Sequence, residues 1–169
     1  MLTGKPDHLK TFDYFGLHRY FLTFCTFERQ RLFTTRESVD LILLQFQRSA
    51  REERFVLIAY CFMPAHVHLL IEAQADDSDA RRFIKAAKQD SGFYFKKHLG
   101  RQLWQRYGFE RTLRRNESTL GVARYIIENP VRARLVQNAE EYPFAGSSVY
   151  GFAEIMEAVA FEPRISRSG

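Results

Sequence analysis

The chain has 169 residues, of which 46% are hydrophobic and 15% aromatic, and its net charge is +5. This composition predicts one globular domain with its own core and excludes a disordered chain. A membrane-spanning helix is excluded as well, because no run of about 20 apolar residues occurs. The N-terminal MLTGKPDHLK lacks the apolar core of a signal peptide. Cys25 and Cys61 lie in apolar runs without a CxxC spacing, so we expect two buried free thiols in a cytoplasmic protein.

The positive charge is concentrated in one third of the chain. Residues 1–80 carry 9 Lys and Arg against 11 Asp and Glu, a net charge of −2, and residues 81–134 carry 14 against 4, a net charge of +10. Residues 135–169 carry 2 against 5, a net charge of −3. This asymmetry favours a polyanionic partner. A membrane surface is the weaker alternative, because no basic amphipathic helix flanked by Trp or Phe stands out.

The first part of the chain predicts a strand followed by a helix. Residues 19–27, RYFLTFCTF, are rich in the β-branched and aromatic residues that favour strands. Residues 34–53 carry apolar side chains at helical intervals, and Thr34 and Glu37 have the spacing of a capping box. We therefore expect a helix of about four turns here.

A tight hairpin is predicted next. Residues 54–63, RFVLIAYCFM, and residues 66–72, HVHLLIE, are two strand-like runs. Only Pro64 and Ala65 separate them, so the two strands should pair antiparallel through a short turn.

The second half of the chain alternates helices with one strand. A basic helix is predicted over residues 81–99, although Ser91-Gly92 weakens its middle. A fourth strand is expected in residues 107–115. The next helix should open near Asn116 and end or kink before Pro130. A short C-terminal helix is expected in GFAEIMEAVAF, residues 151–161.

This order of elements is that of an α+β, ferredoxin-like (RRM-like) βαββαβ sandwich. We expect a four-stranded antiparallel sheet with helices on one face, followed by a C-terminal helix that carries a tyrosine. The predicted divisions are an N-terminal extension (1–18), the main domain (19–151) and a C-terminal helix and tail (152–169). The fold alone assigns no function.

Two histidines stand one residue apart in the second strand of the hairpin. Because successive strand side chains alternate between faces, His66 and His68 project together, roughly 6–7 Å apart along the strand, while Val67 points into the core. Two imidazoles so placed can chelate one divalent cation, with a third ligand from elsewhere. A His-x-His pattern on its own is more often two unrelated histidines than a metal site. The remaining histidines show no spacing relation to this pair: His8, His18 and His98.

Tyr125 and Asn129 are four residues apart in the predicted third helix, so they share one face. The tyrosine and an amide oxygen that can ligate a metal could belong to one functional site. The alternative is a half-buried tyrosine that anchors the helix beside an Asn-Pro stop signal. The proline also favours an Asn129 that leaves the helical region.

Aromatic residues are interleaved with basic ones in residues 92–115, GFYFKKHLGRQLWQRYGFERTLRR. Lysine and arginine neutralise phosphates, and aromatic rings stack on unpaired bases. We expect Phe93, Phe95 and Phe109 in the core and leave Trp104 and Tyr107 for bases. The predicted nucleic-acid-binding residues are Arg81, Arg82, Lys85, Lys88, Lys96, Lys97, Arg101, Trp104, Arg106, Tyr107, Arg111, Arg114, Arg115 and Arg124.

These motifs resemble a known family. The segment MPAHVHLLIE is similar to the histidine–hydrophobic–histidine motif of HUH-type single-strand nucleases. The segment WQRYGFERTLRRNESTLGVARYIIENPVRARLV, followed by EYPFAGSSVYG, is similar to the C-terminal signature of the REP-associated tyrosine transposases, relatives of the single-tyrosine, IS200-like transposases. The resemblance runs from about Tyr20 to Gly151.

The resemblance implies a function for each part of the site. His66 and His68 would be metal ligands, Asn129 a third ligand, and Tyr125 the nucleophile. Such enzymes use Mg²⁺ or Mn²⁺ to cleave single-stranded DNA beside a hairpin through a 5′-phosphotyrosine intermediate, and they act as monomers or homodimers. This chain departs from the family in FERTLR, where Arg111 stands in place of a histidine that relatives often carry. Arg111 then either contacts phosphate or alters the activity.

Two classes of function follow. The first is a metal-dependent endonuclease and strand transferase acting on hairpin-bearing single-stranded DNA. The alternative is a catalytically silent module that binds single-stranded or hairpin nucleic acid, with salt-sensitive affinity that ignores chelators. Another HUH enzyme, such as a replication initiator or relaxase, fits less well, because the chain is small and its tyrosine follows the histidine pair.

Overall fold

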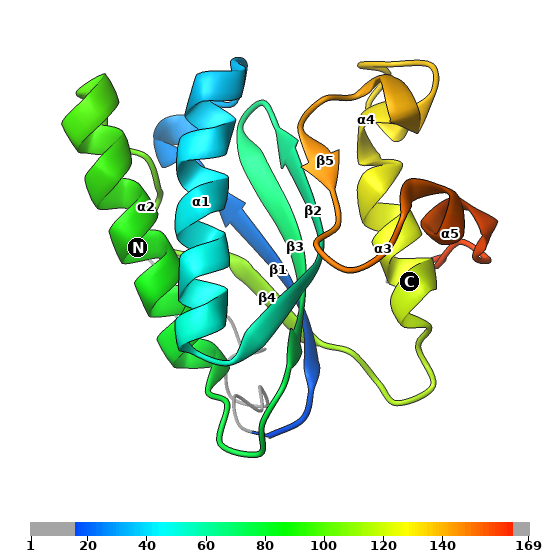
Figure 1. The fold of residues 1–169 in the computed structure, drawn as a ribbon. Coiled ribbons are helices and arrows are strands. Elements are labelled where there is room, and N and C mark those ends of the chain that lie inside the picture. The colour runs from blue at the N-terminus through cyan, green and yellow to red at the C-terminus, as the bar shows by residue number, and fades with distance from the viewer. Residues whose placement is uncertain (1–15, 164–169) are drawn as a thin grey trace, which may run out of the picture.

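A five-stranded antiparallel sheet organises the molecule, in the order β4-β1-β3-β2-β5 (Figure 1). The computed structural model describes residues 16–163. Most of the predicted N-terminal extension (1–18) and the end of the predicted tail (152–169) lie outside these residues. The strands are β1 (Arg19–Cys25), β2 (Phe55–Met63), β3 (His66–Ala73), β4 (Phe109–Thr112) and β5 (Ala145–Gly146).

The first four strands have the order of the predicted ferredoxin-like sheet, and the predicted α+β class is confirmed. The strand count was wrong by one, because β5 adds a short edge beside β2. Two residues are too few to show the alternation by which strands are recognised in a sequence. A two-residue turn, Pro64-Ala65, joins β2 to β3 as predicted.

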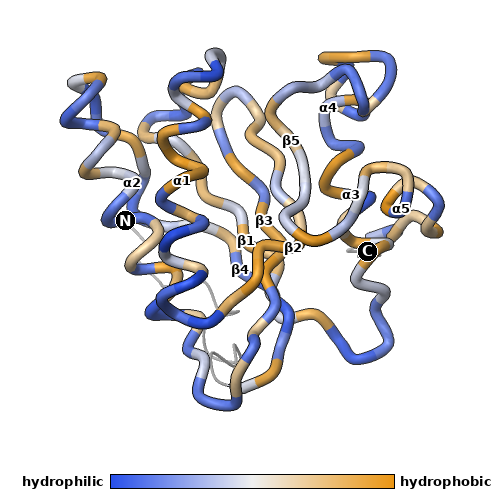
Figure 2. Tube along the Cα trace, viewed as in Figure 1, coloured by the Kyte–Doolittle hydropathy of each residue, from blue (hydrophilic) through white to orange (hydrophobic). Residues whose placement is uncertain are grey.

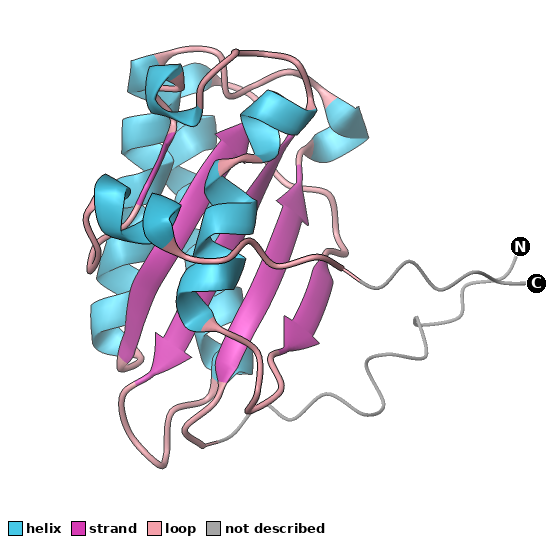
Figure 3. Ribbon diagram, turned by 90° about the vertical axis from the view of Figure 1, so that its right-hand side faces the viewer, coloured by secondary structure: helices cyan, strands magenta, loops and turns pink. Residues whose placement is uncertain are grey.

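Helices cover both faces of the sheet (Figure 1). On one face lie α1 (Arg36–Glu52) and α2 (Ala80–Leu99). The opposite face carries α3 (Thr119–Ile127), with α4 (Asn129–Arg132) and α5 (Phe152–Glu157) beside it. Figure 3 views the molecule from this second side, where α3 crosses in front of the strands. Short 3₁₀ helices, η2 (Phe27–Arg29) and η3 (Ala139–Glu141), complete the described part.

The alternation of strand residues creates two cores. Along β3, Val67, Leu69 and Ile71 pack beneath α1 and α2, while Leu70 packs on the α3 side. The histidines share the parity of Leu70, so the predicted separation of the histidines from Val67 holds. Figure 2 shows long hydrophobic stretches along the β2–β3 hairpin and hydrophilic loops at the lower end of the sheet. The sheet is therefore buried on both faces, and the α3 face carries the histidines.

Two helix starts and the middle of one helix differ from the sequence predictions. The cap of α1 is Thr35, not Thr34: its hydroxyl accepts a hydrogen bond from the Ser38 N–H at 3.2 Å. The cap of α3 is Ser118, which accepts from the Gly121 N–H at 3.0 Å, so this helix opens later than expected. The helix α2 runs through Ser91 without a break.

The third helix ends before Pro130, as predicted. α3 ends at Ile127, and α4 begins at Asn129 with Pro130 in its first turn, where the missing N–H costs nothing. Glu128 between them keeps near-helical angles, φ −80° and ψ −3°. Among residues 16–163, no helix is long and apolar enough to cross a membrane.

Candidate active site

The two histidines of β3 bring their outer nitrogens together. The Nε2 atoms of His66 and His68 lie 3.1 Å apart, and their rings meet edge to face. Two imidazole nitrogens this close together could both contact one cation. The donor atoms therefore have the spacing of a chelating pair, and the residues present fit a divalent ion.

Burial keeps both imidazoles neutral, which is the state that ligates a metal. Burial, the neighbouring His66 and the charge of Arg132 lower the pKa of His68 to about 3. Burial and the charge of Arg29 also lower the pKa of His66. Neither ring therefore carries a positive charge that would oppose a bound cation near neutral pH.

A neighbouring strand orients His68. The Oγ1 of Thr23 on β1 lies 2.8 Å from Nδ1 of His68, and the ring of Phe21 lies 5.5 Å from the imidazole, centroid to centroid. With Nδ1 engaged by the hydroxyl, Nε2 is the nitrogen left to face His66 or a cation.

Tyr125 lies on α3, above the same face of the sheet. Its half-buried ring has Phe21 at 6.5 Å and Phe161 at 5.8 Å between centroids. The guanidinium carbon of Arg132 lies 3.8 Å from the centre of the ring. Because Phe21 contacts both His68 and Tyr125, the predicted nucleophile and the histidine pair share one neighbourhood.

Asn129 is the first residue of α4, which packs beside β2. Its carbonyl accepts a hydrogen bond from the Ala133 N–H at 2.9 Å, so it stays within a helical turn despite the following proline. No cluster of three His, Cys, Asp or Glu suited to a metal exists among residues 16–163.

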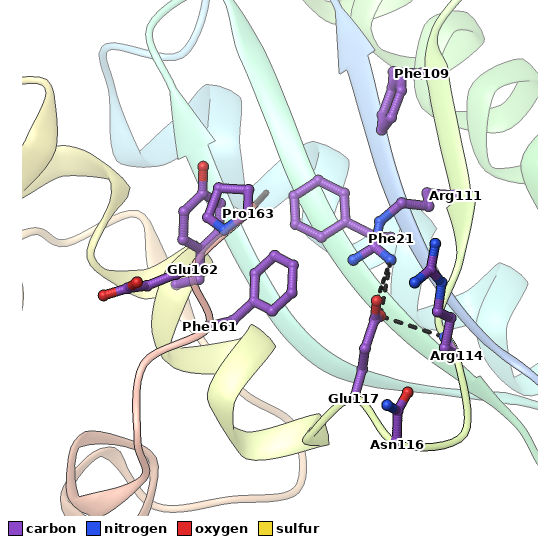
Figure 4. A pocket seen from close by; sticks show the side chains of 10 residues that line it. Phe21, Phe109, Arg111, Arg114, Asn116, Glu117, Phe161, Glu162 and Pro163 are labelled. Atoms are coloured by element: carbon purple, nitrogen blue, oxygen red, sulfur yellow. Dashed lines mark hydrogen bonds and ion pairs between the residues drawn. The ribbon is translucent and has the colours of Figure 1, made fainter. Parts of the chain in front are cut away.

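A cavity of about 490 Å³ opens beside Tyr125 (Figure 4). Phe21 and Arg111 reach it from the sheet, Glu117 from the loop before α3, and Phe161 from the C-terminal segment. Arg111 donates two hydrogen bonds of 2.8 Å to the carboxylate of Glu117. Its guanidinium also lies over the ring of Phe161, 5.3 Å from the centroid. Arg111 thus lies at the site, but an acid neutralises it.

The other predicted basic residues separate into two groups. Arg114 and Arg115 are exposed near the cavity, and Arg114 lines it. Those on α2 lie across the sheet from Tyr125 (Figure 1). They are Arg81, Arg82, Lys85, Lys88, Lys96 and Lys97. The basic third of the sequence therefore does not form one continuous surface around the tyrosine.

Several of these cations have structural partners. Lys88 donates to the carbonyls of Gln105 and Arg106 at 3.1 and 3.3 Å, and burial lowers its pKa. Arg124 pairs with Glu128 at 3.0 Å and donates to carbonyls of the C-terminal segment. Lys88 and Arg124 are thus engaged within the fold. Further pairs join Arg82 to Glu53 and Arg101 to Gln30.

The aromatic assignments needed correction. Trp104 is 7% exposed, stacks against core phenylalanines and donates its indole N–H to Ser91 Oγ at 2.8 Å, so it offers no free face to a base. Phe93 and Phe109, expected in the core, are 61% and 46% exposed. Phe95 is buried as predicted, and Tyr107 is exposed beside the guanidinium of Arg106.

Five residues of the site were missed in the sequence, one of them Phe21, whose position also depends on strand pairing. Arg132 could have been found, because it lies seven residues after Tyr125, two helical turns on and on the same face. Thr23, Glu117 and Phe161 give no such signal, since their positions depend on strand pairing, a loop and a distant segment.

Comparisons with known proteins identify the family of the chain. Residues 15–129 match the family model described as "Transposase IS200 like". A protein assigned as a REP-associated tyrosine transposase in Haemophilus influenzae (strain ATCC 51907 / DSM 11121 / KW20 / Rd) is 23% identical over 137 residues, covering 75% of this chain and 77% of its own.

Two solved structures share the fold. One is a REP-associated tyrosine transposase bound to a REP hairpin, with a TM-score of 0.67, 21% identity and coverage of 86% of this chain and 82% of its own. The other is a protein assigned as a transposase from Deinococcus radiodurans R1, with a TM-score of 0.51, 23% identity and coverage of 84% and 98%. Since the family model spans more than half of the residues and includes both histidines and the tyrosine, the chain belongs to the IS200-like transposase family.

Proposed function

We propose that this protein is a divalent-metal-dependent endonuclease and strand transferase that acts on single-stranded DNA beside a hairpin. The observation that carries the proposal is the meeting of the His66–His68 pair and Tyr125 on one face of the sheet, with Phe21 in contact with both parts. The likeness to a REP-associated transposase bound to a REP hairpin supports a hairpin-bearing substrate.

The chemistry assigned to the residues is phosphoryl transfer to tyrosine. The Oη of Tyr125 forms a bond to phosphorus, the bond from phosphorus to the 3′ oxygen breaks, and the phenol proton ends on that 3′ oxygen. Nothing is oxidised or reduced, and the bond energy is stored in a 5′-phosphotyrosine. Attack by a 3′-hydroxyl on this linkage rejoins the strand and restores the phenol.

His66 and His68, with Asn129 as the third ligand, would hold Mg²⁺ or Mn²⁺. When bound, the ion supplies a Lewis acid that polarises the scissile phosphate. The two imidazoles serve this function as neutral donors, and Thr23 holds His68 in the orientation that directs Nε2 outward.

A catalytically silent hairpin-binding module is the second candidate. Two observations favour it: Glu117 neutralises Arg111, and the ring of Phe161 packs against Tyr125. Such a module would bind the same DNA with an affinity that chelators and loss of both histidines leave unchanged.

One experiment separates the two functions. The protein is incubated with hairpin-bearing single strands labelled at either end, with Mn²⁺ or with EDTA, and resolved on a denaturing gel. Strand transfer predicts a Mn²⁺-dependent covalent adduct with the 3′ part of the strand and a free 3′-hydroxyl on the other part. Tight binding with no adduct on any REP-like hairpin would reject the enzyme and support the binding module.

A further inference from the structure

Arg132 makes a two-point contact with Tyr125. Its guanidinium carbon lies 3.8 Å from the centre of the phenol ring, and its Nη2 donates to the main-chain carbonyl of Tyr125 at 2.5 Å. The hydrogen bond to the carbonyl fixes the position of the guanidinium along the helix, and the contact with the ring holds it against the aromatic face. A planar cation is thus held against the predicted nucleophile.

The break between α3 and α4 preserves this contact. The Arg132 N–H donates to the carbonyl of Glu128 at 3.1 Å, and Pro130 is buried at the start of α4. These interactions continue the helical path across Glu128, so a residue seven positions after Tyr125 returns to its side. The position of Arg132 beside Tyr125 is therefore set by the backbone as well as by the contacts of its side chain.

Arg132 differs in its charge balance from Arg111 and Arg124, which also lie near Tyr125. Arg111 is paired with Glu117 and Arg124 with Glu128. Arg132 has no carboxylate within 4.0 Å among residues 16–163, and its side chain is exposed. A guanidinium has five N–H donors, and the carbonyl of Tyr125 takes one of them. An uncompensated cation with free donors remains beside the phenol.

We propose that Arg132 is a further functional residue of this site, which holds the phenol ring of Tyr125 and binds the phosphate that the phenol oxygen attacks. This inference rests on the proposed function. A guanidinium binds phosphate oxygens through two parallel hydrogen bonds, and a cation over an aromatic face favours negative charge on the ring. Both effects grow as the phenol loses its proton and the phosphate passes through the transition state.

The test compares Arg132→Ala and Arg132→Lys with Arg134→Ala, a matched control for another exposed arginine two residues away. The single-turnover rate of Tyr125 adduct formation and the Kd are measured with one hairpin-bearing strand and Mn²⁺. We expect Arg132→Ala to lower the rate by at least about 100-fold. The Kd should rise by less than about tenfold, as for one lost phosphate contact. Arg134→Ala should leave the rate unchanged.

Chemical rescue separates this function from a structural one. Guanidinium chloride at about 20 mM is far below denaturing concentrations. It should restore part of the rate of Arg132→Ala and none of the rate of a matched His68→Ala variant. Arg132→Lys keeps the charge without the planar fork, so we expect a rate lowered by at least about tenfold. If Arg132→Ala does not fold, as judged by circular dichroism, Arg132→Lys carries the test.

The outcomes distinguish the inference from the function on which it rests. The inference is overturned if the wild type forms the adduct and Arg132→Ala forms it at an unchanged rate. If Arg132→Ala does not fold, an unchanged rate in Arg132→Lys overturns it. In either case the strand-transfer function still stands. A lowered rate that guanidinium does not restore also overturns it, because the loss is then structural. Absence of a Tyr125 adduct in the wild type overturns the proposed function, and this inference with it.

Discussion

Thr23 and His68 face each other across β1 and β3, with Oγ1 and Nδ1 2.8 Å apart. Substituting Thr23→Val removes this hydrogen bond and keeps the shape of the side chain. Loss of an interaction that orients a metal ligand costs about 10–100-fold in metal affinity. We expect a weakening in this range for Mn²⁺, measured by calorimetric titration of the wild type and the variant.

Thr112→Val is the matched control for this prediction. Thr112 lies on β4, next to β1, and its Oγ1 has no hydrogen-bond partner within residues 16–163. This change should leave Mn²⁺ affinity unaltered. Equal affinities in Thr23→Val and Thr112→Val would show that Thr23 does not support a metal ligand.

Acid should destabilise the metal-free protein through His68. Its pKa is about 3 in the folded chain and about 6.5 in the unfolded one, so the folded state binds fewer protons between these values. The contribution of His68 to the free energy of unfolding is complete above pH 6.5 and is lost as the pH falls towards 3. We expect His68→Asn to lose less stability than the wild type over this window, measured by urea unfolding in EDTA.

His98→Asn serves as the control for that titration, because His98 is exposed on α2. Its stability should follow the wild type at every pH. A His68→Asn curve parallel to the wild-type curve from pH 6.5 to 3.5 would contradict the burial of a neutral imidazole in β3.

Glu117 restrains Arg111, and Glu117→Gln should free it. The bidentate contact is partly buried, with side-chain exposures of 31% for Arg111 and 15% for Glu117, so its loss should lower the free energy of unfolding by about 1–2 kcal/mol. The same change leaves Arg111 available to phosphate. We therefore expect tighter binding of single-stranded DNA and a steeper dependence of the Kd on salt, measured by fluorescence anisotropy.

Glu154→Gln removes an exposed carboxylate from α5 without releasing Arg111. This variant is the control, because it changes the net charge by the same amount as Glu117→Gln. If both variants bind DNA equally well, Arg111 is not a phosphate contact, and its position at the cavity reflects packing alone.

Trp104 and Tyr107 should respond in opposite ways to substitution. Trp104→Phe leaves a smaller ring in the core and removes the N–H that bonds Ser91, so we expect a loss of about 1–3 kcal/mol in the free energy of unfolding with an unchanged Kd for DNA. Tyr107→Ala should leave stability nearly unchanged and weaken single-strand binding by about 1–3 kcal/mol. A weakened Kd in folded Trp104→Phe would show that the indole does contact nucleic acid.

The parts of the site that follow a local period could be predicted from the sequence. Strand alternation placed His66 and His68 on one face and Val67 on the other, and the proline correctly predicted that the helix of Tyr125 ends before Pro130. These relations depend only on the regular backbone geometry of one strand or one helix, so a short stretch of sequence is enough to predict them.

The parts that depend on tertiary contacts could not. Trp104 follows α2 and pairs with Thr26 through an isolated bridge, so its burial depends on a segment far away in the sequence. No local pattern distinguishes it from Tyr107, which remains exposed. In the same way, the charge count could not show that the sheet separates the basic side of α2 from Tyr125.

The proposed nucleophile can be identified by mass spectrometry of the covalent adduct. After incubation with a hairpin-bearing strand and Mn²⁺, digestion with nuclease and trypsin should yield the peptide of residues 125–132, YIIENPVR, with a nucleotide linked through its 5′-phosphate to Tyr125. Tyr125→Phe should give no adduct while keeping the wild-type Kd for the strand. A nucleotide on any other residue, or an adduct that persists in Tyr125→Phe, would contradict strand transfer through this tyrosine.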